Sequence, residues 1–375
     1  MSGAVSPILS RQALAKWLTL RRLPGVGGRT QRKLLEHFGS VENIFSADGG
    51  QLEKLLAGKS DAIASVLDGP QVQPLQREFD WLDQPRHHLL VWSDSDYPPL
   101  LREIPDPPLL LYVIGHREAL ALPQIAIVGS RNPSPAGREN AQAFARSLAG
   151  AGLTITSGLA LGVDGAAHRG ALAVGGRTIA ITGTGLDRVY PARHRDLAHE
   201  IAERGALLSE FPLGTPPLPE NFPIRNRLIS GLSLGTLVVE AALQSGSLIT
   251  ARLAAEQGRE VFAIPGSIHA PQARGCHALI RQGAKLVETA QDVIEELGPL
   301  ANVTRYLVSE NDSTTTSLNT TMTTLLQQIG HDPVSIDALI ERSGLTAEIV
   351  SSMLLQMELN GLVANCPGGK VQRIL

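Results

Sequence analysis

The chain has few aromatic residues, few cysteines and no excess of charge of either sign. Phe, Trp and Tyr make up 4% of its 375 residues, so a site that stacks rings on a ligand has very few to use. Cys276 and Cys366 lie far apart and belong to no metal-ligand motif, which argues against a disulfide framework or a structural zinc site. A formal net charge of -3 excludes a protein that coats nucleic acid through bulk positive charge.

Long hydrophobic runs are also missing. No stretch of about 18 apolar residues occurs, and the N-terminus lacks a basic region followed by a continuous apolar segment. We therefore expect a cytoplasmic protein, with no metal or cofactor. Because 43% of the residues are hydrophobic, the chain can bury large cores, and its length predicts about two to three domains.

Residues 1–66 have the pattern of short helices broken by glycine. The turn LPGVGG at 23–28 lies within a stretch, Arg11 to Lys33, that holds seven basic residues and no acid. This pattern predicts a helix-hairpin-helix or SAM-like module, in which Gly25, Gly27 and Arg29 can hold a phosphate. The alternative is a helical hairpin with a solvated basic face.

From about residue 85 the pattern changes to strands. Runs at 88–92 and 109–114 predict extra strands, and short apolar runs then alternate with helical stretches as far as residue 297. The alternation predicts an α/β fold with a Rossmann-like, doubly wound, mostly parallel sheet, whose ligands bind at the carboxyl ends of the strands. The central strands are expected at 125–129, 154–157, 178–182, 207–210, 237–240, 260–264 and 285–287.

The composition changes again near the C-terminus. Ser, Thr and Asn are frequent in residues 309–324, which predicts a linker at 301–324 after a central domain at 67–300. Residues 325–375 have the order of three helices and a small hairpin that is typical of a winged helix. The helix expected at 347–359 offers Glu348, Gln356 and Glu358 but no Lys or Arg, so we favour protein contact or dimerisation over DNA contact for this domain.

The loop after the first central strand reads GSRNPSP and leads into a helix. Pro133 and Pro135 replace glycines of the dinucleotide fingerprint, so NAD or FAD binding has little support. Gly129 and Ser130 at a helix start can instead hold one phosphate, with Arg131 as a planar cationic partner. The competing interpretation is a tight turn in which Arg131 forms a surface ion pair.

Two further loops carry candidate residues. The loop at 157–164 offers Gly158, which allows close approach of a phosphate-bearing chain. Asp164 with His168 one turn later is a possible general-base pair, but Asp164 is more often a helix cap and His168 a packed side chain. The loop at 183–195 contributes Arg193 and Arg195, which alternatively pair with neighbouring Asp residues.

The stretch LPENFPIRNR at 218–227 is the most informative segment of the chain. Phe222 precedes Arg225 and Arg227, and a ring that stacks a base beside fixed cations for phosphates is typical of single-stranded nucleic acid sites. In the alternative, Phe222 is buried under the loop and the arginines bind helix carbonyls. Glu240 ends an apolar strand, so it either accepts hydrogen bonds from a neighbouring loop or acts in catalysis.

Together these segments resemble the DNA processing protein A family (DprA, also called Smf). In family order, the matching segments are YPPLLREIPDPPLLLYVIG, IAIVGSR, TSGLALGVDGAAHRGAL, NFPIRNRLISGLS, EAALQSGSLITARLAAEQGREVFAIPG and LIRQGAKLV. The resemblance implies a homodimer that binds single-stranded DNA without sequence preference and makes or breaks no bond. It further implies that the protein protects incoming DNA in natural transformation and loads the recombinase RecA onto it.

The resemblance also implies a set of site residues. Carried over position by position, the DNA groove consists of Gly129, Ser130, Arg131, Gly158, Phe222, Arg225 and Arg227. Many relatives have a Lys just before the aromatic residue, where this chain has Pro219 and Glu220, and Arg193 or Arg195 is the expected replacement. An exposed edge strand needs covering, so the last strand and the helix before it form the expected dimer surface. Its residues are Leu279, Ile280 and Leu286.

The second hypothesis is an enzyme. The segment GLSLGTLVVEA at 231–241 resembles the Gly-Gly-x-Gly-Thr-x-x-Glu turn of nucleoside-monophosphate phosphoribohydrolases, in which Glu240 would act on a ribose. However, Leu232 replaces the second glycine of that turn, and the loop with Phe222 has no use in a mononucleotide pocket. We therefore favour a binding protein.

Overall fold

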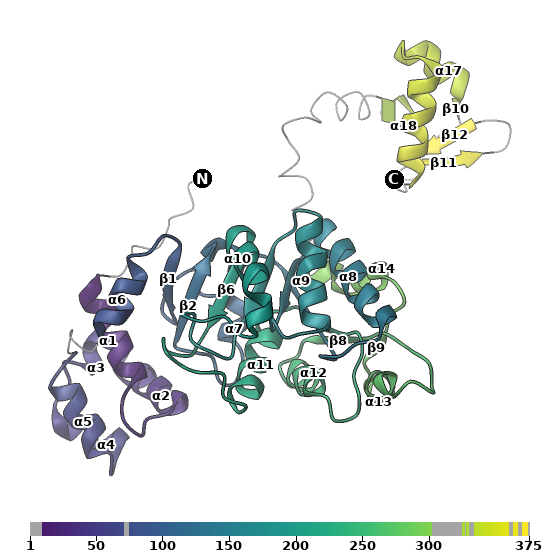
Figure 1. Ribbon diagram of the computed structural model, residues 1–375. Helices are drawn as coiled ribbons and strands as arrows, with labels where there is room; N and C mark the ends of the chain where they lie inside the picture. The colour runs from purple at the N-terminus through teal and green to yellow at the C-terminus, as the bar shows by residue number, and fades with distance from the viewer. Residues whose placement is uncertain are drawn as a thin grey trace. The chain divides into compact units, whose positions relative to one another are not determined.

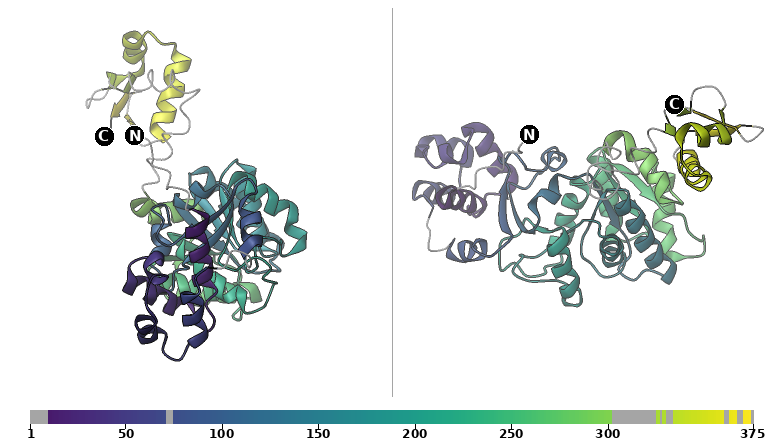
Figure 2. Two further views of the ribbon diagram at one scale, coloured as in Figure 1. Left: turned by 90° about the vertical axis from the view of Figure 1, so that its left-hand side faces the viewer. Right: turned by 90° about the horizontal axis from the view of Figure 1, so that it is seen from above.

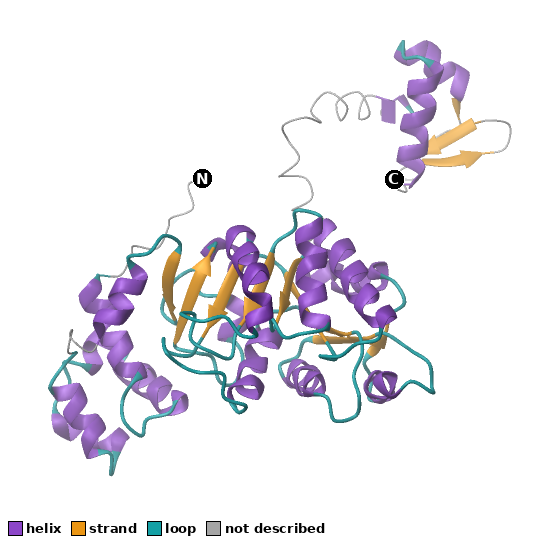
Figure 3. Ribbon diagram, viewed as in Figure 1, coloured by secondary structure: helices purple, strands orange, loops and turns teal. Residues whose placement is uncertain are grey.

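The computed structural model describes residues 10–70, 75–301, 325–326, 328–329, 334–359, 363–366 and 370–373. It divides into a first unit, Met1–Val303, and a second unit, Thr304–Leu375. The first unit holds a helical module and a nine-stranded sheet, and the second holds a three-stranded sheet with helices (Figures 1 and 3). Within these ranges, no helix is both long enough and apolar enough to cross a membrane.

Short helices form the N-terminal module. They are α1 (Arg11–Arg21), α2 (Gly28–Phe38), α3 (Val41–Ile44), α4 (Gly49–Leu56) and α5 (Ser60–Leu67). Side chains that precede them explain where several begin: Ser10 and Ser40 accept backbone hydrogen bonds, and Asp48 forms a capping box with Gln51. The turn between α1 and α2 contains Gly25 at φ 64°, a left-handed conformation that glycine adopts without strain.

The helical module shares its core with the sheet. Trp17 and Leu34 of the module belong to the same cluster of buried side chains as Leu110 and Leu207 of the sheet. The boundary expected at residue 66 therefore lies inside the first unit.

The large sheet contains each of the nine strands expected from the sequence. In chain order they are β1 (His87–Val91), β2 (Leu110–Gly115), β3 (Gln124–Val128), β4 (Thr154–Ser157), β5 (Thr178–Ile181), β6 (Ala206–Ser209), β7 (Gly235–Val238), β8 (Glu260–Ala263) and β9 (Lys285–Leu286). Their spatial order is β1-β2-β6-β5-β4-β3-β7-β8-β9. Strand β2 pairs antiparallel with β1 and β6, and every other pair is parallel. The predicted Rossmann-like sheet with extra N-terminal strands is thus confirmed.

Helices cover both faces of this sheet (Figures 1 and 2). One face carries α8 (Pro135–Gly150), α9 (Val163–Ala173), α10 (Arg195–Arg204) and α14 (Ala290–Ala301). The other carries α7 (Pro99–Arg102), α11 (Asn221–Gly231), α12 (Gly246–Glu256) and α13 (Arg274–Arg281). The helix α6 (Gln76–Leu82) leads into β1. Because both faces are covered, strands β3 to β7 are wholly buried. Most of them are short, largely apolar runs, whereas β4 reads TITS.

The topological switch point of the sheet is β3. From β3 the chain winds through β4, β5 and β6 on one side, then crosses back to β7, β8 and β9 on the other. The loops after β3 and β7 therefore lead away in opposite directions from neighbouring strands. This divergence opens a crevice at their carboxyl ends.

The second unit is the predicted winged helix. It consists of β10 (Val334–Ser335), α17 (Ile336–Ser343), α18 (Ala347–Leu359), β11 (Val363–Cys366) and β12 (Lys370–Arg373), with antiparallel strands in the order β10-β12-β11. Its core includes Leu339, Val350 and Val363. Apart from residue 301, the linker expected at 301–324 lies outside the described residues.

Candidate nucleic-acid interface

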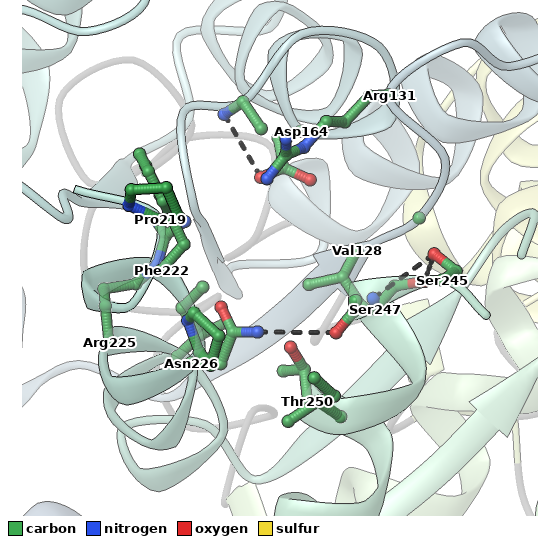
Figure 4. Close-up of a pocket in the computed structure, with 16 residues that line it drawn as sticks. Val128, Arg131, Asp164, Pro219, Phe222, Arg225, Asn226, Ser245, Ser247 and Thr250 are labelled. Atoms are coloured by element: carbon green, nitrogen blue, oxygen red, sulfur yellow. Dashed lines mark hydrogen bonds between the residues drawn. The ribbon is translucent and has the colours of Figure 1, made fainter. Parts of the chain in front are cut away.

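A cleft of about 430 Å³ opens at the switch point, and we call it the switch-point cleft (Figure 4). The loop after β3, the loop after β4, helix α11 and the start of α12 all line it. Figure 4 shows Arg131, Phe222 and Ser247 on three different sides of this cleft. The cleft therefore collects residues from loops that are more than a hundred positions apart in the sequence.

Close contacts hold the backbone of the loop after β3, Gly129 to Arg131, in place. A Cβ on Gly129 would lie 2.7 Å from Val163 Cγ2 and 2.9 Å from the carbonyl oxygen of Glu240. The amide of Ser130 donates to that carbonyl at 2.7 Å, and the amide of Val163 donates to Ser130 O at 3.1 Å. The loop is thus held between α9 and the segment after β7, and the Arg131 side chain is exposed. Within the described ranges no carboxylate pairs with Arg131, so the surface ion pair of the competing interpretation is not found there.

Glu240 has a structural role that the sequence had left open. Its carboxylate accepts hydrogen bonds from the amide of Ser134, at 2.9 Å, and from the Ser134 hydroxyl. A Cβ on Gly137 would overlap this carboxylate. A negative charge is favourable here because the N-terminus of α8 carries the positive end of the helix dipole. Of the two alternatives for Glu240, the geometry matches hydrogen bonds with a neighbouring loop, and Glu240 does not line the switch-point cleft.

Arg225 forms the floor of the cleft and is 4% exposed. Its guanidinium donates to the carbonyls of Gly158, at 2.6 Å, and Ile181. Asp164 accepts from the amides of Gly158 and Ala160 at 3.1 and 3.2 Å. Burial raises the pKa of Asp164 and lowers that of Arg225 to about 10, and the charge of each group opposes the shift of the other. Arg225 therefore ties together the ends of β4 and β5 instead of projecting freely into the cleft.

Asp164 and His168 do not form a catalytic pair. His168 is completely buried and its Nδ1 lies 2.6 Å from the Thr178 hydroxyl. Burial is the main reason that the pKa of His168 falls to about 3, which keeps the imidazole neutral. The packed position expected for His168 agrees with this geometry. Asp164 does not cap α9 as expected: it lies in the first turn of that helix and accepts hydrogen bonds from the preceding loop instead.

Phe222 lies in the first turn of α11, whereas the sequence analysis placed it in the preceding loop. Asn221 fixes the start of the helix, because its side-chain amide donates to Gly183 O at 3.0 Å. Pro223 is the third residue of the helix, where no intrahelical partner for an N–H is needed. The segment therefore becomes helical four residues before Arg225.

The Phe222 ring is half-buried, and two guanidinium groups lie near it. Its centroid lies 5.8 Å from Cζ of Arg131 and 5.9 Å from Cζ of Arg225, within cation–π range. Tyr190 lies beside it, with ring centroids 5.7 Å apart and an interplanar angle of 44°. A small cavity of about 90 Å³ opens here, lined by both rings, Arg131 and Leu161. Sequence reasoning missed Tyr190; the only signal was an aromatic residue in an arginine-rich loop.

Arg227 lies on the other side of α11 from Arg225. Residues two positions apart on a helix are separated by about 200°, so the two side chains cannot share a face. Arg227 forms two parallel hydrogen bonds of 2.7 Å to Glu210 and approaches Asp106 at 3.6 Å. It lines neither the switch-point cleft nor the small cavity. This geometry favours a structural role for Arg227 over the phosphate contact expected from the resemblance.

The two arginines expected to replace the family's Lys have different positions. Arg193 lines a second cavity of about 380 Å³, which also contains Arg131, Arg138 and Arg169. We call this cavity the arginine groove. Arg195, the first residue of α10, is exposed but lines none of these cavities.

The N-terminal candidates lie apart from these cavities. Gly25, Gly27 and Arg29 belong to the turn before α2 and to its first residues, and none of them lines the switch-point cleft. A Cβ on Gly28 would lie 3.5 Å from a carboxylate oxygen of Asp106, so this helix start faces an acid. Several members of the basic run have carboxylate partners: Arg11 with Asp83, Arg22 with Glu78 and Arg32 with Glu36.

The residues expected at a dimer surface differ in exposure. Leu279 is buried in the main core and Ile280 packs against that core. Leu286 on the edge strand β9 is 45% exposed. Of these three residues, Leu286 is therefore the most accessible to a partner. Among the residues described, no group of three or more His, Cys, Asp or Glu is placed to hold a metal ion.

Comparison with known sequences places this geometry in a family. Residues 88–298 match the family described as DNA recombination-mediator protein A, and residues 310–369 match the DprA winged helix domain. Protein Smf of Escherichia coli is 47% identical over 353 residues, which covers 89% of this chain and 93% of the relative. The DNA processing protein DprA of Streptococcus pneumoniae is 48% identical over 203 residues, or 54% of this chain and 72% of the relative.

Solved structures agree with this assignment. The X-ray structure of DprA from Streptococcus pneumoniae has a TM-score of 0.68 and 37% identity, covering 77% of this chain and 99% of that chain. DNA processing protein A from Helicobacter pylori, whose structure addresses its single-stranded DNA binding mode, has a TM-score of 0.52 and 32% identity, covering 58% and 97%. The sheet, the winged helix and the sequence matches agree, and the chain belongs to the DNA recombination-mediator protein A (DprA/Smf) family.

Proposed function

We propose that this chain binds single-stranded DNA in the switch-point cleft without sequence preference, and that it acts as a recombination mediator and not as an enzyme. The observation that carries the proposal is the pairing of Arg131 with Phe222. Arg131 is an exposed cation without a carboxylate partner in the described chain, and its guanidinium lies over the face of a half-buried ring. A cation for a phosphate beside a ring for a base is the basic unit of sequence-tolerant strand binding.

The opposite wall of the cleft offers a second place for a phosphate. Ser245 caps α12, and Gly246 and Ser247 follow it in the first turn. The positive end of the helix dipole favours an anion at this helix start. Asn226 Nδ2 donates to Gly246 O at 3.4 Å and so links this helix start to α11. A strand that crosses the cleft would thus have phosphate contacts on both sides and a base on Phe222.

The absence of a bond-making step is part of the proposal. Glu240 would be the reactive carboxylate of a phosphoribohydrolase, but it is held by Ser134 at the start of α8. Asp164 accepts two backbone hydrogen bonds and lies near the buried Arg225. Both carboxylates are thus engaged in holding loops. Their engagement supports a binding protein.

The biological role that we propose follows from membership of the family. The bound strand would be incoming DNA in natural transformation, which the protein protects in the cytoplasm and passes to RecA. A homodimer would form through the β9 edge, where Leu286 is exposed. Two joined clefts raise the affinity for one long strand by effective concentration.

Two substitutions test the cleft separately for charge and for stacking. Arg131→Ala should weaken binding to unrelated single strands about tenfold and should flatten the dependence of log K on log salt by about 0.7. Phe222→Ala should cost about 1–3 kcal/mol of binding and should leave the salt slope unchanged, because it removes no charge. Fluorescence anisotropy titrations between about 50 and 200 mM salt measure both quantities.

Arg146→Ala is the matched control, because Arg146 is exposed on α8 and lines none of the cavities described above. It should bind like the unmodified chain. If Arg131→Ala and Phe222→Ala both keep the affinity and the salt slope of the unmodified chain, the cleft is not the binding site.

A further inference from the structure

The arginine groove adjoins the switch-point cleft, and we propose that it is a second phosphate track that carries the same DNA strand onward across the start of α9. This inference rests on the proposed function, and it gives a role to Arg138 and Arg169. The track would lengthen the segment of single strand that one protomer holds. Its occupant is therefore a polynucleotide backbone and not a separate small anion.

The groove gathers cations from four places in the fold. Arg131 comes from the loop after β3 and Arg138 from α8, whereas Arg169 comes from α9 and Arg193 from the short helix η3 (Ala192–His194). No Asp or Glu lines this groove of about 380 Å³. The four side chains are exposed, and no carboxylate pairs with them in the part of the chain that the structure describes.

Two other arginines of the same unit have carboxylate partners. Arg77 pairs with Asp187 at 2.6 Å, and Arg227 pairs with Glu210 at 2.7 Å. Unpaired like charges repel one another, and a polyanion in the groove would relieve that repulsion. The planar guanidinium fork also matches two oxygens of one phosphate. The groove therefore has the charge and the donor geometry of a phosphate site.

The groove and the cleft are continuous through shared residues. Arg131 lines the switch-point cleft, the small cavity beside Phe222 and the arginine groove. Leu161 lines the small cavity and the groove. Between them the backbone packs closely, because a Cβ on Gly162 would lie 2.3 Å from Ser130 O. A strand that leaves Phe222 past Arg131 thus enters the groove directly, which favours DNA over an unconnected ligand.

The dependence of binding on strand length tests the track. The full chain, the double variant Arg138→Ala/Arg169→Ala and the control Arg146→Ala are titrated with oligothymidylates of about 4 to 30 nucleotides. Short strands that occupy only the cleft should bind all three proteins equally. Long strands should bind the double variant about tenfold more weakly, with a salt slope reduced by about 1.4, because two phosphate contacts are lost. Equal thermal unfolding midpoints show that the variants are folded.

The other outcomes separate this inference from the proposed function. If the double variant binds long strands like the control, the groove holds no DNA. An equal loss at every length would also overturn the track, since both arginines would then act on the cleft itself. A further outcome is that the double variant binds inorganic polyphosphate or an acidic peptide more weakly than the control does, yet binds DNA equally well. In that case the groove binds another polyanion and the track is overturned. A full chain that binds no strand of any length would overturn the proposed function itself.

Discussion

Arginine has two distinct roles in this chain, and burial separates them. Arg225 and Arg227 bind carbonyls or a carboxylate and hold loops in place. Arg131, Arg138 and Arg169 are exposed, and no carboxylate of the described residues pairs with them. Of the 33 basic residues 27 are Arg, and a rigid guanidinium suits both roles better than an ammonium. The net charge of -3 therefore conceals two arginine populations, of which only the exposed one is available to a ligand.

At the residue scale, Gly158 should be intolerant of any side chain. A Cβ at this position would lie 2.5 Å from Arg225 Nη1 and 2.7 Å from Asp164 Oδ2, between two buried charged groups. Gly158→Ala should therefore lower the free energy of unfolding by about 2–4 kcal/mol. Urea unfolding followed by tryptophan fluorescence measures this loss.

The control for that change is Gly150→Ala at the end of α8, where a Cβ would meet no atom within 4 Å. In a helix this replacement should be neutral or stabilising by up to about 1 kcal/mol. If Gly158→Ala unfolds at the same urea concentration as the unmodified chain, the close packing around Arg225 is not a constraint.

At the scale of elements, the strands were predictable from the sequence, whereas the start of α11 was not. Strands β3 to β7 are buried on both faces, and most of their sequences are short, largely apolar runs, with TITS in β4 as the exception. The start of α11 depends on the hydrogen bond from Asn221 to Gly183, a contact between distant segments that no local pattern reveals. Because the segment is helical from Asn221, Arg225 and Arg227 point to different sides.

For a similar reason, the arginine groove could not be predicted from the sequence. Its residues occupy positions 131, 138, 169 and 193, on four elements that only the fold brings together. The N-terminal basic run shows the opposite case. There the cations are adjacent in sequence, but Arg11 and Arg22 are paired with acids of α6 and the turn after it. Clustering in sequence is thus a poor guide to which cations remain free.

The edge strand β9 leads to a prediction about assembly. Leu286 is 45% exposed on a strand that pairs on one side only with β8. Leu286→Glu should place a charge in the proposed dimer interface and should weaken the dimer about a hundredfold, because an unpaired buried charge is costly. Analytical ultracentrifugation over a range of concentrations measures the dissociation constant.

Leu243→Glu is the matched control, since Leu243 is an exposed leucine in the loop between β7 and α12. It should leave the dimer unchanged. A dimer of unaltered strength in Leu286→Glu would move the interface away from β9.

At the scale of the whole molecule, the helical module and the sheet of the first unit should unfold together. They share one core, and all three tryptophans, at positions 17, 81 and 92, belong to this unit. Tryptophan fluorescence therefore reports the first unit alone. Removing residues 1–66 would expose the sheet side of that core. The truncated chain should therefore be less stable, whereas the loss of a separate domain would leave the stability of the rest unchanged.

The buried His168 makes the stability of this unit sensitive to acid. Its pKa is about 3 in the folded state and about 6.5 in the unfolded chain, so the unfolded chain binds the extra proton between these values. Stability should fall as the pH drops below about 6.5, by about 2 kcal/mol from this residue between pH 8 and pH 5. Urea unfolding at a series of pH values measures this dependence.

Replacing His168 by Gln removes the titrating group, so His168→Gln should be less stable at neutral pH but should lose less stability on acidification. His199→Gln, at an exposed position of α10, should keep the pH dependence of the unmodified chain. If His168→Gln loses as much stability on acidification as the unmodified chain, another group controls the acid response.

Because Arg131 lines three cavities, position 131 should tolerate substitution less than the other arginine positions of the groove. Among the cavities described, only the arginine groove is lined by Arg138, Arg169 and Arg193. Each of these residues can therefore be substituted alone while the other two still contact the strand. A change at Arg131 alters all three cavities at once, whereas Arg225, which lines two of them, is bonded to backbone carbonyls. In a randomised library selected for binding to single-stranded DNA, position 131 should stay Arg while the three groove positions tolerate substitution one at a time.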